Sequence, residues 1–242
     1  IVNLDKLTYA GNRASISDLE DFKHYRFVQG DVADRQFLTS LFEQERFDGV
    51  IHFAAETHVD RSIKDSGPFV QTNIVGTHVL LEMSQKYGVL RFHQVSTDEV
   101  YGDLGLGSTD FFTEKTPLAP NCPYAATKAS ADLLVLSWHE TYGLPAVITR
   151  CSNNYGPYQF PEKLIPFFLH RALRGESLPV YGDGLYVRDW LYVLDHCEAI
   201  LMVFEQSDPG EVWNIGGHNE KTNIEIAERI LDQVGKKGAE IT

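Results

Sequence analysis

The stretch Gly49-Val50-Ile51-His52-Phe53-Ala54-Ala55 decides the fold, because it is a short apolar run of the kind that forms a fully buried strand. Residues 69–87 follow with the length of a helix, and Gly88 stands where that helix should end. Residues 90–96 are expected to form the next strand. A strand, a helix and a second strand at this spacing predict parallel strands that are covered by helices.

The same alternation continues on both sides of this unit. We expect further strands at residues 1–4, 26–29 and 146–150, and helices at residues 16–22, 35–44 and 124–142. Asp34 is a suitable N-cap for the second of these helices, and Gly143 closes the third. The pattern predicts an α/β fold with a Rossmann-like, doubly wound parallel sheet over residues 1–155.

Residues 156–242 show a different sequence pattern, because prolines and glycines divide them into shorter expected elements. We expect helices at residues 162–174, 195–206 and 224–234, the last capped by Asn223, and a strand at residues 211–215. These residues predict a smaller α/β domain that binds the substrate, with some segments returning to the main sheet.

Composition narrows the possible partners. The net charge of −13 disfavours nucleic acid and membrane surfaces, which are themselves negative. No run of 18 apolar residues is present, so no transmembrane helix is expected. Three cysteines without a paired spacing predict no disulfide framework and favour a reducing, cytoplasmic location. The nine histidines lack the spacing of metal ligands, and no metal site is expected.

Tyr124 and Lys128 form a Tyr-x-x-x-Lys pair on the expected helix 124–142. Four residues apart, they share one helix face, and the lysine charge would favour the phenolate that a base requires. Ser96 and Thr97 end the preceding strand, where the third member of a Ser/Thr-Tyr-Lys triad belongs. The alternative is a surface tyrosine and a surface lysine, since the pair alone is common.

Asp98 and Glu99 follow Thr97 directly, at the strand end where ligands bind in parallel sheets. Two neighbouring carboxyl groups whose pKa values differ can serve as acid and base. Such a pair is more than an alcohol dehydrogenase needs and indicates the loss of water. The alternative is two solvated loop carboxylates.

Asp5 ends the first expected strand of this chain. In a nucleotide-binding fold, an acid at the end of the second strand bonds the ribose hydroxyls of NAD and disfavours the 2′-phosphate of NADP. Asp31 has the same placement, and both residues could equally be turn formers. The Gly-x-Gly-x-x-Gly loop that cradles the pyrophosphate is absent. We therefore expect the first strand and its glycine loop to be missing, and this polypeptide alone to bind NAD poorly.

Arg188 follows the turn at residues 182–184 and could clamp a phosphate, or form a structural ion pair with Asp189 or Asp183. No nucleophile elbow, P-loop or Cys-His pattern is present, which argues against a hydrolase or a kinase.

Together these motifs resemble the extended short-chain dehydrogenase/reductase family, and within it the 4,6-dehydratases that act on dTDP-glucose. The resemblance covers essentially the whole chain, with the most similar segments at residues 5–12, 53–62, 95–102, 150–157 and 161–166. Thr97-Asp98-Glu99 is its specific part, since related epimerases lack the acid pair and related decarboxylases usually carry Ser in place of Asp98.

The resemblance implies a lyase with NAD as cofactor. Tyr124 would take the proton of the glucose 4-hydroxyl as hydride leaves C4, Glu99 would remove the C5 proton, and Asp98 would protonate the departing 6-hydroxyl. Hydride would then return to C6. Thr97 would bond the C4 oxygen, and Lys128 would tune Tyr124 and hold the ribose.

The resemblance also implies binding residues. The NAD site would comprise Asp5, Lys6, Leu7, Thr8, Asp31, Val32, Ala54, Ala55, Thr72, Tyr124, Lys128 and Asn154. The dTDP-glucose site would comprise Thr57, Asn153, Lys163, Leu164, Pro179, Tyr181, Arg188 and Asn223. Helices 69–87 and 124–142 would pair across a homodimer. Two alternatives stay open: a related nucleotide-sugar epimerase, decarboxylase or dehydratase, and a non-catalytic protein of the same fold.

Overall fold

The computed structural model describes residues 1–105, 107–235 and 240–242. It divides into two compact units. The first unit contains residues 1–103, 111–150 and 200–214, and the second contains residues 104–110, 151–199 and 215–242.

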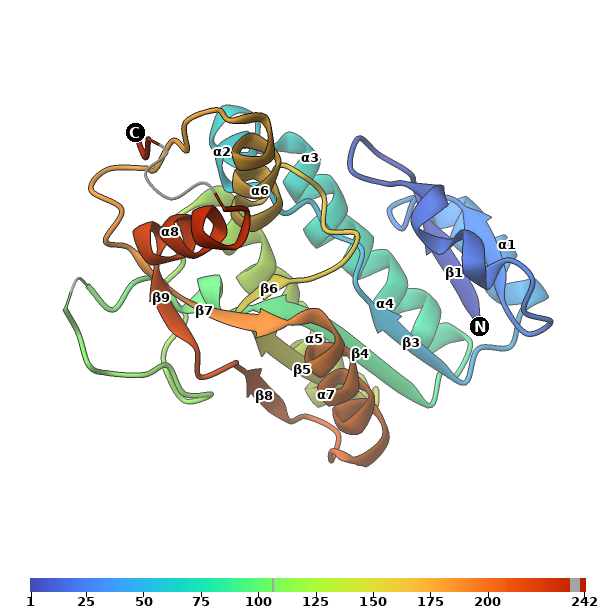
Figure 1. Ribbon diagram of the computed structural model, residues 1–242. Coiled ribbons are helices and arrows are strands. Elements are labelled where there is room, and N and C mark those ends of the chain that lie inside the picture. The colour runs from blue at the N-terminus through green and yellow to red at the C-terminus, as the bar shows by residue number, and fades with distance from the viewer. Residues whose placement is uncertain (106, 236–239) are drawn as a thin grey trace. The chain divides into compact units, whose positions relative to one another are not determined.

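Strands of the first unit form the βαβ arrangement that residues 49–96 predict. Strand β3 (Gly49–His52) pairs in parallel with β4 (Arg91–Thr97), with Gly49 opposite Arg91. Their sheet continues through β5 (Ala146–Cys151) to β8 (Val212–Ile215). A separate parallel pair consists of β1 (Val2–Asp5) and β2 (Arg26–Gln29) (Figure 1). The prediction of parallel strands that alternate with helices is therefore confirmed.

Helix α1 (Arg35–Gln44) begins where Asp34 predicts, because the Asp34 carboxylate accepts a hydrogen bond of 3.0 Å from the Phe37 amide. Its apolar face is buried against helix α4 and strand β4, and the cluster includes Leu38, Leu81 and Phe92. This cluster is the core that supports the carboxyl ends of the strands.

The expected helix at residues 69–87 is one helical run with an irregular centre. It comprises α3 (Gly67–Phe69), a π-helical segment η2 (Val70–Gly76) and α4 (Thr77–Lys86), and Gly88 follows with a φ of +68°. A short helix α2 (Val59–Lys64), which the sequence pattern missed, precedes it. Asn73 lies in the π-helical segment and is 1% exposed.

The prediction of an α-helix at residues 16–22 is wrong. A 3-10 helix, η1 (Arg13–Leu19), occupies this region, and none of its residues is buried. A short helix gains most of its stability from packing an apolar face. Without that packing, the Asn12 side chain starts a tighter turn by accepting a hydrogen bond from the Ala14 amide.

Helix α5 (Pro123–Tyr142) has the expected bounds within one residue. Pro123 occupies its first turn, where the missing N–H costs nothing, and Gly143 ends it in the left-handed conformation at φ +69°. The helix packs on strand β4 and on the π-helical segment η2.

The second unit contains a small mixed sheet. Strand β6 (Asn153–Tyr155) is parallel to β7 (Val187–Tyr192), and β7 is antiparallel to β9 (Glu220–Thr222). Helices α6 (Leu164–Arg174) and α8 (Asn223–Gln233) share a core that includes Phe168 and Ala227. Helix α7 (Val193–Gln206) begins in this unit and ends in the first unit.

The N-cap of α8 is Thr222, so the prediction that Asn223 caps this helix is wrong. The Thr222 hydroxyl accepts a bond of 3.2 Å from the Glu225 amide, and the Glu225 carboxylate accepts one of 2.7 Å from the Thr222 amide. This reciprocal capping box satisfies two amides at the helix start, whereas Asn223 satisfies none there.

No helix among the described residues is long and apolar enough to cross a membrane. Within the same residues, no group of three or more histidine, cysteine or acidic side chains could hold a metal ion. None of the three cysteines takes part in a disulfide in the part of the chain that the structure describes.

Candidate active site

Tyr124 and Lys128 lie one turn apart at the start of α5, and both are buried. The Lys128 ammonium donates a hydrogen bond of 2.7 Å to the carbonyl of Val95 in strand β4. Lys128 is 4% exposed, so little water screens its charge, and that charge acts strongly on neighbouring groups. The alternative of a surface tyrosine and a surface lysine is therefore wrong, because both side chains are buried.

Thr97 ends strand β4, and the 3-10 helix η3 (Asp98–Tyr101) follows at once. The Thr97 hydroxyl lies 3.2 Å from an Asp98 carboxylate oxygen, to which it donates, and it accepts from the Glu99 amide at 3.2 Å. Neither acid is fully exposed. The threonine thus holds the side chain of Asp98 and the backbone of Glu99 at the carboxyl end of the sheet.

The acid pair is held against the helix that carries Tyr124 and Lys128. Val100 and Tyr101 of η3 share a buried apolar cluster with Ala129 of α5. Gly102 then turns the chain at φ +89°, and a Cβ at that position would lie 2.4 Å from the carbonyl oxygen of Ala119. Only glycine fits this turn without strain, so a single residue type fixes where the acid-bearing segment ends.

A buried ion pair, which the sequence analysis missed, lies below these residues. Asp132, one turn beyond Lys128, accepts a 2.9 Å hydrogen bond from Arg150 of β5. Arg150 also donates to the Tyr101 hydroxyl at 2.9 Å, and Tyr101 donates to Asn214 at 2.7 Å. Burial raises the pKa of Asp132, although Arg150 acts in the opposite direction. Burial by itself lowers the pKa of Arg150, but Asp132 and the Tyr101 hydroxyl together raise it above its ordinary value. The sequence signal that could have identified Asp132 is its spacing of four residues from Lys128, which places both on one face of the helix.

His52 at the end of β3 is a second buried group that the motifs did not identify. Its Nε2 lies 3.0 Å from the Thr77 hydroxyl, which in turn donates to the Asn73 carbonyl. Burial, together with the charge of Lys128, lowers the pKa of His52 to about 3. The imidazole is therefore neutral in the folded protein.

This neutral histidine predicts acid sensitivity. In the unfolded chain His52 binds a proton near pH 6.5, whereas in the folded protein it does so only near pH 3, so the unfolded state binds more protons in between. Stability should fall as the pH drops through this window, by up to about 1.4 kcal/mol per pH unit. The free energy of unfolding, measured with urea, should depend less steeply on pH in the His52→Gln variant between about pH 6 and pH 4.

The matched control is His24→Gln, because His24 is exposed. Its slope should equal that of the parent protein. An equally shallow slope in both variants, or in neither, would contradict the assignment to His52. His196, whose pKa burial lowers to about 4, should account for part of the slope that remains.

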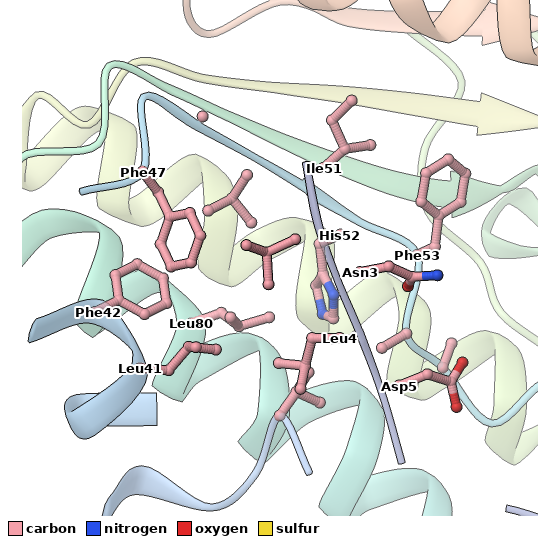
Figure 2. A pocket seen from close by; sticks show the side chains of 16 residues that line it. Asn3, Leu4, Asp5, Leu41, Phe42, Phe47, Ile51, His52, Phe53 and Leu80 are labelled. Carbon is pink, nitrogen blue, oxygen red and sulfur yellow. The ribbon is translucent and has the colours of Figure 1, made fainter. Parts of the chain in front are cut away.

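A cavity of about 340 Å³ lies between the edge strands β1 and β3 (Figure 2). Apolar side chains from α1, α4 and both strands form part of its wall. Figure 2 shows Asp5 at the opposite end from Phe47. Four of the residues expected to bind NAD line it: Asp5, Val32, Ala54 and Ala55. The structure thus places part of the expected cofactor site at the carboxyl ends of β1 and β3.

Lys6, Leu7 and Thr8, which are also expected to bind NAD, directly follow β1, and Asp31 contacts Lys6. Lys6 forms an ion pair of 2.6 Å with Asp31. Partial burial opposes it, but the bonds from Lys6 and from the Ala33 amide lower the pKa of Asp31 below its usual range. Asp5 accepts from the Leu7 amide at 2.6 Å and is exposed, and Leu7 has a φ of +55°. Both acids therefore form turns, and Asp5 keeps an exposed carboxylate.

These residues fit the adenosine half of a dinucleotide. An exposed carboxylate can accept from ribose hydroxyls, and small apolar residues can contact an adenine ring. Thr8 is exposed and Thr72, in η2, is partly buried. The sequence contains no glycine loop for the pyrophosphate, so the fit does not extend to that group.

The residues expected to contact the sugar nucleotide belong to the second unit, apart from Thr57. Asn153 lies in β6, and Arg188 lies in β7, a strand that the sequence analysis did not predict. Asp189 accepts from the amides of Gly217 and Asn219, and among the described residues no ion pair joins Arg188 to Asp189 or Asp183. Lys163 and Leu164 start α6, Asn223 starts α8, and Pro179 and Tyr181 are exposed.

Asn154, which was assigned to the cofactor, has a buried partner that the sequence did not indicate. Its side-chain oxygen lies 2.8 Å from Nδ1 of His196, and its amide donates to the Ser152 carbonyl at 3.0 Å. His196 is 6% exposed. The two residues are 42 positions apart in the chain, so no local pattern could have joined them.

Comparisons with known proteins agree on one family. The profile of the GDP-mannose 4,6 dehydratase family matches residues 1–241. A dTDP-glucose 4,6-dehydratase of Neisseria meningitidis serogroup B is 55% identical over 239 residues, which cover 95% of this chain and 67% of that protein. Among solved structures, the dTDP-glucose 4,6-dehydratase of Bacillus anthracis in complex with NAD is 50% identical with a TM-score of 0.92, and covers 100% of this chain and 74% of that one.

A further solved structure is DesIV of Streptomyces venezuelae, a dTDP-glucose 4,6-dehydratase with NAD bound. It is 47% identical, has a TM-score of 0.95, and covers 100% of this chain and 73% of that one. The doubly wound α/β fold expected from the sequence is thereby confirmed.

Proposed function

Because the chain belongs to the GDP-mannose 4,6 dehydratase family, we propose that it is an NAD-dependent dTDP-glucose 4,6-dehydratase, a lyase that removes water from its sugar substrate. One observation carries this proposal. The segment with Thr97, Asp98 and Glu99 packs against the helix with Tyr124 and Lys128, so acid, base and hydroxyl groups of one compact unit share one sheet end.

Each of these side chains has a role in the proposed reaction. Tyr124 accepts the proton of the sugar 4-hydroxyl, helped by the nearby charge of Lys128. Glu99 removes the proton at C5, which the neighbouring ketone makes acidic, and Asp98 protonates the departing 6-hydroxyl. Thr97 bonds the oxygen at C4. Bound NAD would supply the acceptor for the hydride of C4 and the source of the hydride that C6 receives. Glu99 then gives its proton back to C5, so that the alkene left by water loss is reduced.

The binding residues are proposed by the same reasoning. Residues 1–155 supply the NAD site, with the Asp5 carboxylate on the ribose hydroxyls and with Val32, Ala54 and Ala55 beside the adenine. Residues 156–242 supply most contacts to dTDP-glucose, with Arg188 as the phosphate ligand. Arg188 is exposed and bonds only its own strand backbone among the interactions of the described residues.

The direct test is to incubate the protein with dTDP-glucose and a large excess of NAD, because weak NAD binding is expected, and to follow the product by mass spectrometry. Loss of one water from the sugar nucleotide, without net formation of NADH, is the expected result. An epimerase would leave the mass of the sugar nucleotide unchanged. A decarboxylase acts on a sugar acid and would leave dTDP-glucose unreacted. Either result would contradict the proposal.

Replacement of Asp98 with Asn separates the two halves of the reaction. The amide cannot donate an acidic proton to the 6-hydroxyl, so water loss should slow by about 10²- to 10⁴-fold while oxidation at C4 continues. NADH absorbance should therefore persist after mixing with substrate. Asp110→Asn, at an exposed loop position, should behave as the parent protein. Equal loss of both steps in Asp98→Asn would contradict the assigned role.

We also propose a homodimer through the helical run 67–86 and α5. Val70 and Leu133 are large apolar residues on these helices and are 43% and 58% exposed. Water contact with such residues is reduced when helices pair. Light scattering coupled to gel filtration measures the assembly directly, and a monomer at micromolar concentration would contradict this proposal.

A further inference from the structure

The backbone amide of Tyr124 has a partner outside its own helix. Tyr124 is the second residue of α5, and amides of a first turn lack acceptors within the helix. The hydroxyl of Ser62 in α2 accepts from this amide at 3.1 Å, across 62 residues of sequence. Ser62 also donates to the Val59 carbonyl at 2.6 Å and is 1% exposed. The hydroxyl is thus fully used and fixed.

The carbonyl side of Tyr124 is held as well. The Thr127 hydroxyl donates to the Tyr124 carbonyl at 2.7 Å and accepts from the Asn73 side chain at 2.9 Å. Asn73 also accepts from the Glu56 amide at 2.8 Å and donates to the Glu56 carbonyl at 3.0 Å. The Tyr124 amide is therefore bonded directly to a buried side chain of α2, whereas its carbonyl is bonded to Thr127 of the same helix and through Thr127 to Asn73 of η2.

The ring of Tyr124 has a further support. Phe69 of α3, which is 2% exposed, meets it edge to face, with ring centroids 6.4 Å apart and planes at 72°. Backbone and ring are thus held from α2, α3 and η2, which all precede α5 in the chain. Such agreement of independent contacts on one residue is more than a helix start requires.

We propose that Ser62 is a positioning residue for Tyr124. By accepting its amide, Ser62 sets the height and rotation of the first turn of α5, and so the place of the phenol oxygen relative to the substrate. This inference rests on the proposed dehydratase function for its catalytic consequence. A base works only within hydrogen-bond reach of its proton, and a shift of about 1 Å can cost about 10²-fold in rate.

The test compares Ser62→Ala with Ser137→Ala in the full chain. Ser137 is an ideal control, because its hydroxyl also donates to the carbonyl three residues earlier, at 2.8 Å, but on the exposed side of α5. Two readouts are needed: hydrogen exchange of the Tyr124 amide by NMR, and kcat and KM with dTDP-glucose, including substrate deuterated at C4. Thermal unfolding shows that both variants are folded.

In Ser62→Ala we expect the Tyr124 amide to exchange at least tenfold faster, kcat to fall by about 10- to 100-fold with KM nearly unchanged, and the deuterium effect on kcat to rise. Ser137→Ala should match the parent. Unchanged exchange in Ser62→Ala overturns the proposal, and so does faster exchange with an unchanged kcat. A parent protein without activity on dTDP-glucose overturns the proposed function alone, since the exchange measurement still decides whether Ser62 holds Tyr124.

Discussion

Replacement of Tyr124 with Phe is expected to lower kcat for dTDP-glucose by about 10²- to 10⁴-fold and to leave the fold intact. The change removes the phenol oxygen, which is the only atom of this side chain that can accept the proton of the sugar 4-hydroxyl. It keeps the ring that packs against Phe69 and the backbone that Ser62 and Thr127 hold. Steady-state kinetics, together with thermal unfolding of the same preparation, measure both parts of the prediction.

Tyr142→Phe is the matched control. It removes the same hydroxyl from the other end of α5, where the side chain is 54% exposed. Activity and stability should stay at parental values. Should Tyr124→Phe keep more than a tenth of the parental kcat, another group must take the proton and the proposed role of Tyr124 is wrong.

Replacement of Asp132 with Ala is expected to destabilise the protein by about 3–5 kcal/mol. Arg150, which is 4% exposed, would be left with a buried charge whose main partner has gone. Its hydrogen bond to Tyr101 would remain but cannot neutralise that charge. Urea unfolding at neutral pH, followed by circular dichroism, gives the difference in the free energy of unfolding.

Two further variants make this result specific. Glu140→Ala changes an exposed acid on the same helix and should alter stability by no more than about 0.5 kcal/mol. The double variant Asp132→Leu with Arg150→Met removes both charges together and should be more stable than Asp132→Ala alone. If the double variant is as unstable as the sum of its single changes, packing and not charge accounts for the loss.

Local sequence signals determined much of the fold. Asp34, Gly88 and Gly143 mark helix ends because caps and left-handed glycines act over one turn. The apolar run that became β3 needed no long-range information, since a strand buried on both faces favours apolar residues, whereas β4 also carries buried polar residues such as His93 and Gln94. The pattern failed at residues 16–22, where no core was present to stabilise an α-helix, and at β6 and β9, which have three residues each. It also failed at β7, where Arg188 and Asp189 interrupt the apolar residues.

The candidate site likewise contains residues that the sequence identified and residues that it did not. Tyr124 and Lys128 could be found because four residues make one helical turn, and Thr97, Asp98 and Glu99 because they directly follow a strand. The partners that hold them could not be found. Ser62 is 62 residues from Tyr124, and Arg150 is 18 residues from Asp132 across a strand and a helix.

The sequence by itself therefore determined the order of the elements and the chemical groups at the carboxyl ends of the strands. Both depend on spacing within a few residues. Only the tertiary structure decided that Ser62, Asn73 and Phe69 support Tyr124, that Asp132 meets Arg150, and that a cavity lies between β1 and β3. The reason is that side-chain hydrogen bonds and packing depend on distances in space, which residue spacing along the chain does not encode.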